Sequence, residues 1–293
     1  MKPTAFDYYA PSTLKGVLEL KAQHGEDAKP LAGGQSLIPT MNFRVTQPSI
    51  LVDLNAVDEL RFIEGKDGDL RIGAMTTQNV VERSELVSDL QPLIAETIPY
   101  VAHPQIRNRG TFGGSLAHAD PASELPAIAL ALNAKFKAVS LSGERWVEAQ
   151  DFLITMFTVD LQPDEILAEI AFPNFPKTTG WSFMEVSRRM GDYAMAGVAA
   201  LLSLDAAGKC EYARLVYLNV GDKAMDAVNA AGALVGEEIN EESINAAAEI
   251  AGEEEIDPFG SVHASPEYQR HLSKVVTRRA LREAHQRASN SVK

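Results

Sequence analysis

The chain of 293 residues carries a net charge of −13, has a pI near 5.0 and is 45% apolar. That apolar share is ample for a packed core, and the length predicts two domains of about 150 residues each. The acidic balance makes nucleic acid a poor partner, because a negative surface is repelled by phosphate backbones. The single cysteine, Cys210, excludes a disulfide within the chain and an iron–sulfur cluster held by this chain's thiols alone.

The N-terminal segment MKPTAFDYYAPST shows no apolar signal core, and no window approaches about 18 uninterrupted apolar residues. We therefore expect a cytoplasmic protein without a membrane span. Cys210 lies in the apolar segment KCEYARLVYL and is expected to pack as a small hydrophobic residue.

Residues 1–56 predict a small α/β unit. In chain order we expect an aromatic leader at 6–11, a helix from 14 to 25, a strand at 29–32, a helical turn and a strand at 49–54. Ser12 or Thr13 suits the N-cap of the helix, and Leu14, Val17 and Leu18 contribute to its apolar face.

A second unit begins with a hairpin, because a turn at 66–69 separates short apolar runs at 60–63 and 70–74. We expect two helices next, one after Thr76 or Thr77 that reaches Leu86, and one that carries Leu90 to Ile98. The stretch 103–124 has three glycines, two prolines and little periodicity, so we expect a long and functional loop. A helix at 121–132 and strands at 134–140, 145–148 and 165–172 complete this unit.

A segment rich in Pro, Thr and Gly at 174–180 predicts a domain boundary. Beyond it we expect strands at 181–186, 198–204 and 213–219, a turn at Gly208 and Lys209, and helices at 224–236, 241–252 and 266–288. The acidic clusters at 237–238 and 253–255 are expected to be solvated faces or helix ends.

The last predicted helix carries a basic stripe, since Arg270, Lys274, Arg278 and Arg282 recur every four residues. The simplest interpretation is a charged face in solvent. The alternative is a seam for an acidic surface of a partner.

Two glycine turns stand out. The predicted strand at 29–32 runs into Gly33 and Gly34, and Ser36 and Pro39 suit the start of a helix. Strand, glycine turn and helix start form an arrangement that holds a phosphate on free amides, although each turn alone is also explained as a tight turn. The sequence 111–115, TFGGS, again has two glycines followed by a hydroxyl residue. The two turns together are therefore able to converge on one diphosphate.

Four segments carry a family resemblance: AGGQSLIPTMNFR, IGAMTT, PQIRNRGTFGGSLAHADPASELPA and SRRMGDYAMAGVAA. They resemble the FAD-binding medium subunit of the molybdenum hydroxylases, the xanthine dehydrogenase family. The resemblance is strongest to flavoprotein subunits of the aerobic carbon monoxide dehydrogenase and nicotine or quinoline dehydrogenase type. It implies an α+β fold with an FAD-binding domain at 1–177, made of α/β subdomains at about 1–56 and 57–177. A C-terminal domain of antiparallel strands plus helices follows at 178–293.

The resemblance also implies roles for single residues in holding FAD. The pyrophosphate contacts Ala32, Gly33, Gly34, Gln35, Ser36 and Leu37 in the first turn and Thr111, Gly113, Gly114 and Ser115 in the second. The ribityl and adenosine side contacts Ile106, His118, Asp120 and Glu124, and Ile166 and Leu167 line the adenine or ring pocket. Tyr193 lies next to the isoalloxazine, with Arg189 and Asp192 nearby. Gln35 and Ser115 stand where relatives often carry His and Asn, and both retain a hydrogen-bonding side chain.

The residues alone leave plainer interpretations open. His103 and His118 also fit loop hydrogen bonding, and no metal site in this chain is expected, because no second His or carboxylate lies at metal-ligand spacing. Tyr193 also fits an ordinary strand aromatic. Arg107 and Arg109 are solvated in the usual case, or else neutralise a phosphate or meet a partner. Glu124 also fits a first-turn charge on a helix.

The resemblance implies a non-covalent FAD and no catalytic residue in this chain. It implies a large molybdopterin-binding subunit, a small subunit with two [2Fe–2S] clusters, and a dimer of such heterotrimers. Electrons would leave to a quinone, another carrier, NAD or oxygen, and the substrate belongs to the large subunit. The competing functions are a self-sufficient FAD-dependent oxidase or dehydrogenase, which would need a catalytic dyad of its own, and a binding module that has lost its cofactor.

Overall fold

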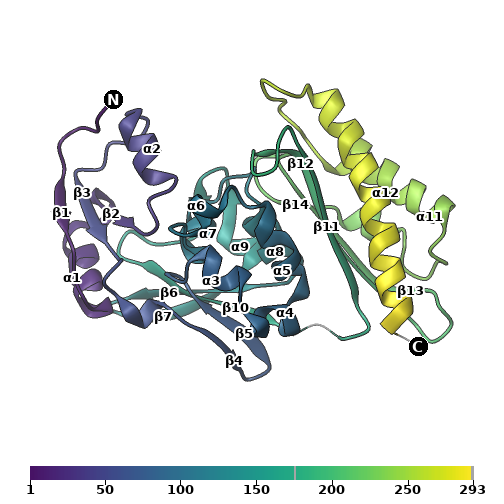
Figure 1. The fold of residues 1–293 in the computed structure, drawn as a ribbon, viewed down its shortest axis with the longest axis horizontal. Coiled ribbons are helices and arrows are strands. Elements are labelled where there is room, and N and C mark those ends of the chain that lie inside the picture. The colour runs from purple at the N-terminus through teal and green to yellow at the C-terminus, as the bar shows by residue number, and fades with distance from the viewer. Residues whose placement is uncertain (175, 292–293) are drawn as a thin grey trace.

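A computed structural model describes residues 1–174 and 176–291. Figure 1 shows three units in a row, with the N-terminal unit at one end and the C-terminal sheet with its long helix at the other. No helix in the described ranges is long and apolar enough to cross a membrane.

The N-terminal unit is built on a small parallel sheet. Its strands are β1 (Asp7–Tyr9), β3 (Ile50–Asp53) and β2 (Ala28–Leu31), with β3 in the middle. Helix α1 (Leu14–His24) is capped by Thr13, whose hydroxyl accepts from the amide of Gly16 at 3.1 Å. The prediction of an aromatic leader is wrong at 7–9, because this exposed segment pairs with β3 and Tyr8 donates a hydrogen bond to Asp53.

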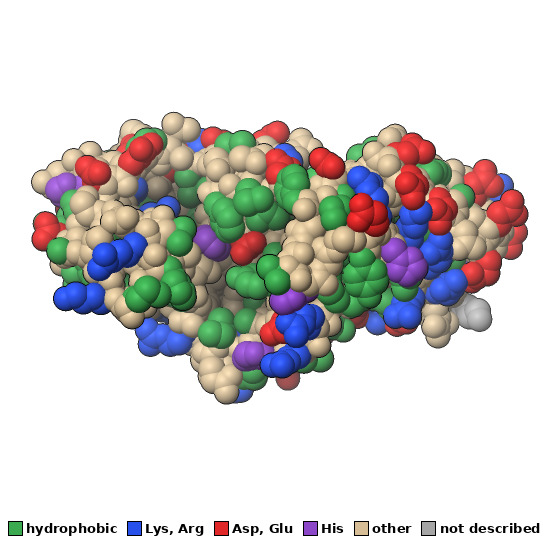
Figure 2. All heavy atoms as spheres, turned by 90° about the horizontal axis from the view of Figure 1, so that it is seen from above, with side chains coloured by type: hydrophobic (Ala, Val, Ile, Leu, Met, Phe, Trp, Pro, Cys, Tyr) green, Lys and Arg blue, Asp and Glu red, His purple; other side chains and the backbone are tan. Residues whose placement is uncertain are grey.

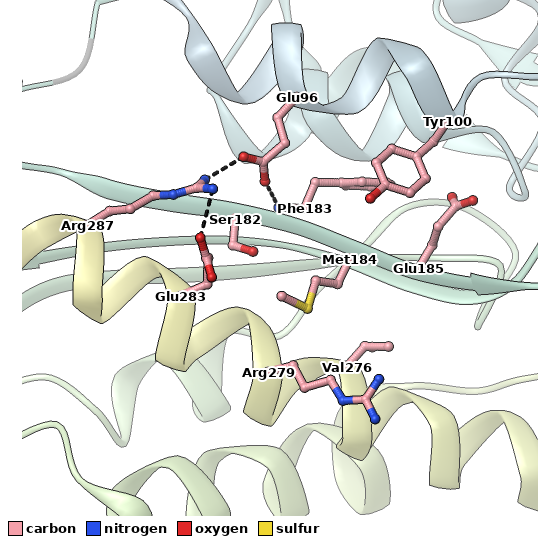
Figure 3. Close-up of a pocket in the computed structure, with 10 residues that line it drawn as sticks. All are labelled: Glu96, Tyr100, Ser182, Phe183, Met184, Glu185, Val276, Arg279, Glu283 and Arg287. Carbon is pink, nitrogen blue, oxygen red and sulfur yellow. Dashed lines mark hydrogen bonds and ion pairs between the residues drawn. The ribbon is translucent and has the colours of Figure 1, made fainter. Parts of the chain in front are cut away.

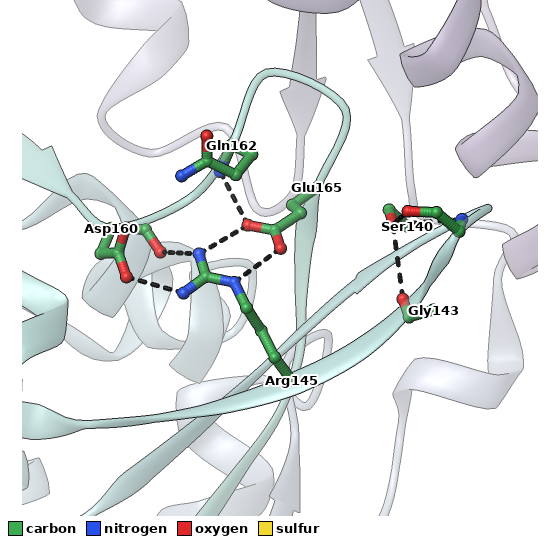
Figure 4. Close-up of polar contacts among 7 residues, drawn as sticks. Ser140, Gly143, Arg145, Asp160, Gln162 and Glu165 are labelled. Atoms are coloured by element: carbon green, nitrogen blue, oxygen red, sulfur yellow. Dashed lines mark hydrogen bonds and ion pairs between the residues drawn. The ribbon is translucent and has the colours of Figure 1, made fainter.

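The central unit is a five-stranded antiparallel sheet in the order β4-β5-β10-β6-β7. The strands are β4 (Ile63–Lys66), β5 (Asp69–Gly73), β10 (Ile166–Pro173), β6 (Lys135–Ser140) and β7 (Gly143–Glu148). The predicted hairpin is confirmed as β4–β5. Figure 4 shows how Arg145 on β7 bonds Glu165, directly before β10, at 2.7 and 2.8 Å and Asp160 at 2.7 Å. This cluster fastens the sheet edge to the loop that leads into the central strand.

The central unit also contains short helices: α3 (Gln78–Glu82), α4 (Glu85–Leu90), α5 (Pro92–Thr97), α8 (Glu124–Ala131) and α9 (Ala149–Phe152). Helices α4 and α9 contact its own sheet, whereas α5 and α8 contact the C-terminal sheet. The single helix expected to reach Leu86 is wrong, because Ser84 interrupts it and caps α4 by accepting from the amide of Val87. A two-stranded hairpin, β8 (Leu153–Thr155) and β9 (Thr158–Val159), follows α9.

The long loop predicted at 103–124 is also wrong in part. It contains α6 (Pro104–Arg107) and α7 (Phe112–His118). Glycines disfavour helix, so the sequence of α7 gives a weak helical signal. The helix forms because Thr111 caps it and because Phe112 and Leu116 are buried in the central core.

The C-terminal unit is an antiparallel meander of β11 (Gly180–Ser187), β12 (Ala194–Leu204), β13 (Cys210–Leu218) and β14 (Met225–Asp226). Helices α10 (Val228–Gly232), α11 (Glu241–Ile250) and α12 (Pro266–Ser291) follow, and α12 lies across β11 and β12. Cys210 is buried as expected.

Both interpretations of the basic stripe are wrong, because its partner is the chain's own α11 and the turn that follows. Lys274 bonds Glu249 at 2.6 Å and also contacts Glu253. Arg278 and Arg282 pair with Glu249 and Glu241, each at 2.6 Å. The acidic cluster at 253–255 is therefore partly engaged rather than simply solvated.

Candidate functional site

The two glycine turns, far apart in the sequence, lie against each other. A Cβ added to Gly33 would stand 2.3 Å from the carbonyl oxygen of Arg109 and 2.8 Å from the Cα of Gly110. A Cβ added to Gly114 would stand 3.2 Å from the Cβ of Ala32. The missing side chains of both turns are therefore what allows the N-terminal and central units to meet here.

The first turn presents free donors. Within residues 1–174 and 176–291, the amides of Gly33, Gly34, Gln35 and Ser36 donate no hydrogen bond. Ser36 precedes α2 (Leu37–Asn42) without a side-chain cap bond, and Gln35 donates to the carbonyl of Gly33 at 2.9 Å. Unpaired amides at the start of a helix form a ready anion site.

The second turn differs, because its amides are already used. The amides of Phe112 and Gly113 donate to the carbonyls of Thr76 and Ala74 at 2.8 and 2.9 Å. Those of Gly114 and Ser115 donate to the hydroxyl and carbonyl of Thr111. This turn therefore offers the half-buried Ser115 hydroxyl rather than free amides, and its two glycines pack against Ala74, Thr111 and Ala32.

A cavity of about 370 Å³ opens beside the first turn, at the carboxyl ends of β2 and β3. It is lined by Leu31, Ala32, Gly33, Gly34, Gln35, Ile38, Pro39, Asp53, Asn55 and Arg109. Arg109 is exposed and makes no side-chain hydrogen bond or ion pair in the part of the chain that is described. Its guanidinium is thus available to a ligand beside the free amides.

Sequence reasoning missed Asp53 and Asn55. Asn55 donates to the carbonyl of Ala32 at 3.0 Å and to Asp53 at 2.7 Å, so it ties the end of β3 to the first turn. Burial opposes a charge on Asp53, but hydrogen bonds from Tyr8 and Asn55 and the charge of Arg109 lower its pKa. The available signal was their place at the carboxyl end of a buried parallel strand, which Asp53 ends and Asn55 follows, where ligands bind in α/β sheets.

The face seen in Figure 2 is hollowed between the N-terminal and central units. His118, at the end of α7, packs against Phe157 with ring centroids 5.0 Å apart and the rings tilted by 40°, and burial lowers the pKa of the imidazole. Tyr193 is 67% exposed. Partial removal from water and then the charge of Asp120 raise the pKa of Tyr193, which places these two groups within electrostatic reach.

The loop that carries Arg189, Asp192 and Tyr193 is docked on the central unit. Gly191 has φ +85°, and a Cβ there would stand 2.4 Å from Nδ1 of His103. The amide of Asp192 donates to the carbonyl of Arg189 at 3.0 Å and closes the turn. This contact holds Tyr193 near the boundary between the central and C-terminal units.

Other candidate residues lie elsewhere. Ile166 and Leu167 are 2% and 6% exposed, so their side chains belong to the hydrophobic core and do not line the cavity. Ile106 is half-buried on α6. Arg107 is neither solvated nor free for a ligand, because it bonds Glu82 at 2.8 Å and the carbonyl of Val101 at 3.0 Å.

Comparison with known proteins decides the family. Residues 4–175 match the FAD binding domain in molybdopterin dehydrogenase, and residues 181–284 match the CO dehydrogenase flavoprotein C-terminal domain. The chain belongs to the FAD-binding medium subunits of the molybdenum hydroxylases. The predicted family, fold and cofactor are thereby confirmed.

Relatives cover this flavoprotein subunit almost end to end. The 6-hydroxypseudooxynicotine dehydrogenase complex subunit alpha of Paenarthrobacter nicotinovorans is 42% identical over 98% of this chain and 97% of its own length. The carbon monoxide dehydrogenase structure from Hydrogenophaga pseudoflava superposes with a TM-score of 0.94 at 36% identity, over 98% of this chain and 99% of that one. Quinoline 2-oxidoreductase from Pseudomonas putida gives 0.93 at 39% identity, over the same shares. This flavoprotein subunit is thus a component of a multi-subunit oxidoreductase.

Proposed function

We propose that the flavoprotein subunit binds FAD non-covalently at the contact between its glycine turns and passes electrons from a partner's [2Fe–2S] clusters to an external acceptor. The observation that carries this proposal is the row of free amides from Gly33 to Ser36 beside the unpaired guanidinium of Arg109. The donors suit a diphosphate, because amides and a guanidinium stabilise its charge locally even in an acidic protein. When bound, FAD supplies the redox chemistry, and the protein supplies position and electrostatics.

In this proposal, the candidate residues contribute different groups to the binding of FAD. The first turn, Ala32 to Leu37, donates amides to the phosphates, and Arg109 adds a positive charge. The second turn, Thr111 to Ser115, packs against the first turn through Gly114 and adds the Ser115 hydroxyl. Tyr193 covers the ring system, and His118 and Asp120 border the hollow between the N-terminal and central units. Glu124 is buried at the start of α8. Covalent attachment is disfavoured, because burial raises the pKa of the Cys210 thiol to about 11 and Cys210 lies on β13.

Membership of this family supports a proposal for the partners. We propose a large molybdopterin-binding subunit that carries the substrate and a small subunit with two [2Fe–2S] clusters, assembled as a dimer of heterotrimers. The division into an FAD-binding domain at 1–177 and a C-terminal domain at 178–293 is part of the same proposal. The relatives named above act on an N-heterocycle derivative, carbon monoxide and quinoline, so the family alone leaves the substrate class open.

The test begins with the purified full chain stripped of cofactor. After titration with FAD and removal of the unbound cofactor, the protein should keep a flavin spectrum that corresponds to one FAD per chain. Denaturation should then release intact FAD. FMN, which lacks the second phosphate and the adenosine, should bind more weakly. A colourless chain that leaves FAD free would refute the proposal. Turnover of an organic donor by the chain alone would instead favour a self-sufficient oxidase.

A further inference from the structure

We propose that Asn55 is a positioning residue for FAD binding, because its side chain fixes the orientation of the first glycine turn. This inference rests on the proposed function. Asn55 follows β3, 23 residues after Ala32, and both residues border the cavity of about 370 Å³. Asp53 and Tyr8 hold Asn55 in turn, so a chain of three side chains supports the turn from outside.

Asn55 acts on a peptide plane of the turn. Its Nδ2 atom donates to the carbonyl oxygen of Ala32 at 3.0 Å. A trans peptide is planar, so its carbonyl and its amide point in opposite directions, and a hydrogen bond to the carbonyl fixes the amide as well. The amide on this plane belongs to Gly33, which donates to no group in the described ranges. Asn55 therefore sets the direction of a donor that is free for a ligand.

The next peptide plane is held in the same way, but from within the turn. Nε2 of Gln35 donates to the carbonyl of Gly33 at 2.9 Å, and the amide on that plane belongs to Gly34. Glycine is the most permissive residue of the backbone, and Gly34 takes φ +72°. A pair of glycines therefore needs such bonds if its amides are to keep one direction. Asn55 is the one of the two side chains that is anchored outside the turn.

Asn55 is itself fixed at the end of β3. Its Nδ2 atom and its backbone amide both donate to Oδ1 of Asp53, at 2.7 and 2.8 Å. Oδ2 of Asp53 accepts a hydrogen bond from the hydroxyl of Tyr8 on β1. Arg61 donates to the carbonyl of Asn55 at 3.1 Å. The contacts thus run from β1, past the end of β3, to Ala32 directly after β2.

The partners of Asn55 also fix which way its amide points. The Ala32 carbonyl and the Asp53 carboxylate are acceptors, and both lie against Nδ2. Oδ1 of Asn55 faces a guanidinium nitrogen of Arg61 at 3.4 Å. Exchanging the nitrogen and the oxygen would place oxygen against oxygen at both short contacts. The role of Asn55 toward the turn is therefore that of a donor.

The test measures the affinity of the purified full chain for FAD and for riboflavin by fluorescence titration. Asn55→Ala removes the donor at an exposed position, so the fold should be retained. FAD should bind about fivefold more weakly, because one neutral hydrogen bond contributes roughly that factor. Riboflavin, which has no phosphate, should bind with the parent affinity. Asn55→Gln keeps an amide donor and should recover part of the loss.

Equal losses for the two ligands would mean that Asn55 supports the fold and not the phosphate donors, which overturns the proposal. Unchanged FAD affinity in Asn55→Ala overturns it as well. If the parent chain does not bind FAD at all, the proposed function fails. If the parent and Asn55→Ala bind FAD equally well, only this inference fails, and the two failures are thereby told apart.

A second arm tests the chain of contacts behind Asn55. Tyr8→Phe removes only the hydroxyl that Asp53 accepts from, at a residue that is 54% exposed. FAD affinity should fall in the parent background, by less than in Asn55→Ala. It should not fall further when Tyr8→Phe is added to Asn55→Ala, because the effect passes through Asn55. Additive losses would overturn the proposed chain.

Glu283→Gln is the control, in a second cavity of about 330 Å³ where α5, β11 and α12 meet. Figure 3 shows Glu283 bonded there to Arg287, at 2.9 Å. Loss of this bond loosens a side chain at a cavity wall without touching the first turn, so both affinities should stay at the parent value. A loss of FAD affinity equal to that of Asn55→Ala would mean that general loosening is the cause, and the proposal would fail.

Discussion

The Cα of Gly33 packs directly on the carbonyl of Arg109, where an added Cβ would stand only 2.3 Å from the oxygen. This contact joins the first glycine turn to the residue that precedes the second turn by two positions. Because the backbone of Arg109 is held here, its side chain reaches the cavity that the free amides of the first turn border. The close approach of these two backbone segments thus places the positive charge of Arg109 beside the free amides of the first turn.

Gly33→Ala should separate the two turns. Real Cβ atoms are essentially never found this close to another heavy atom. The atom in the way is the backbone carbonyl oxygen of Arg109, which is unable to rotate away as a side chain would. We expect a loss of about 1–3 kcal/mol in the free energy of unfolding and at least a tenfold loss of FAD affinity. The measurements are urea unfolding and fluorescence titration. Gly232→Ala is the matched control, since nothing lies within 4 Å of its added Cβ in α10, and it should be neutral or stabilising.

Arg109→Gln should weaken FAD binding by about 10- to 150-fold, because one charge-assisted hydrogen bond contributes on the order of 1.5–3 kcal/mol. Arg109→Lys should recover part of the loss. Affinity for FAD should also depend less on salt in the glutamine variant. Riboflavin, which has no phosphate, serves as the control ligand and should bind both proteins alike. Equal FAD affinities in the parent and Arg109→Gln would show that the guanidinium does not meet the phosphates.

The sequence predicts an element of this fold well when the signal lies in that element's own residues, and poorly when the element depends on contacts with distant residues. Helix α12 and strand β10 were predicted nearly in full, because long periodic or continuous apolar runs signal them directly. The short strand β1 is exposed along its length and depends on pairing with β3, so no pattern in Asp7–Tyr9 announces it.

The site shows the same limit. The glycine turns were evident, yet TFGGS does not reveal that its amides are consumed inside the protein. Arg107 and Arg109 stand two positions apart with the same chemistry. One is buried against Glu82 and the other lines the cavity, and only the tertiary position of Glu82 on α3 separates them. Residue type predicts what a group is able to do, and packing decides whether it is free to do it.

Tyr193→Ala should retain FAD while changing its reduction potential or the rate of electron transfer to the acceptor. The side chain is 67% exposed, so its removal leaves no core cavity and should alter stability little. Spectroelectrochemical titration of the loaded chain measures the potential. Tyr212→Ala, at a tyrosine that is 39% exposed on β13, serves as a control for loss of a surface aromatic. An unchanged potential and acceptor rate would identify Tyr193 as an ordinary strand residue.

A buried hydroxyl pair fastens α12 to the sheet. Tyr217 on β13 lies 2.5 Å from the hydroxyl of Thr277, which itself donates to the carbonyl of Ser273 at 2.6 Å. Thr277 therefore accepts the Tyr217 proton, and the two substitutions are not equivalent. Tyr217→Phe removes one bond and leaves Thr277 bonded to Ser273, at a cost of about 1 kcal/mol. Thr277→Val strands a buried phenol, at a cost of about 1–3 kcal/mol.

Unfolding in urea with both single variants and the double variant separates the two effects. The double variant should be less destabilised than the sum of the singles, since no polar group is then left unpaired. Burial raises the pKa of Tyr217 far beyond its usual range, so the phenol stays neutral and the ranking should hold from pH 6 to about 9. If Tyr217→Phe lowers the free energy of unfolding more than Thr277→Val does, the assignment of donor and acceptor is reversed.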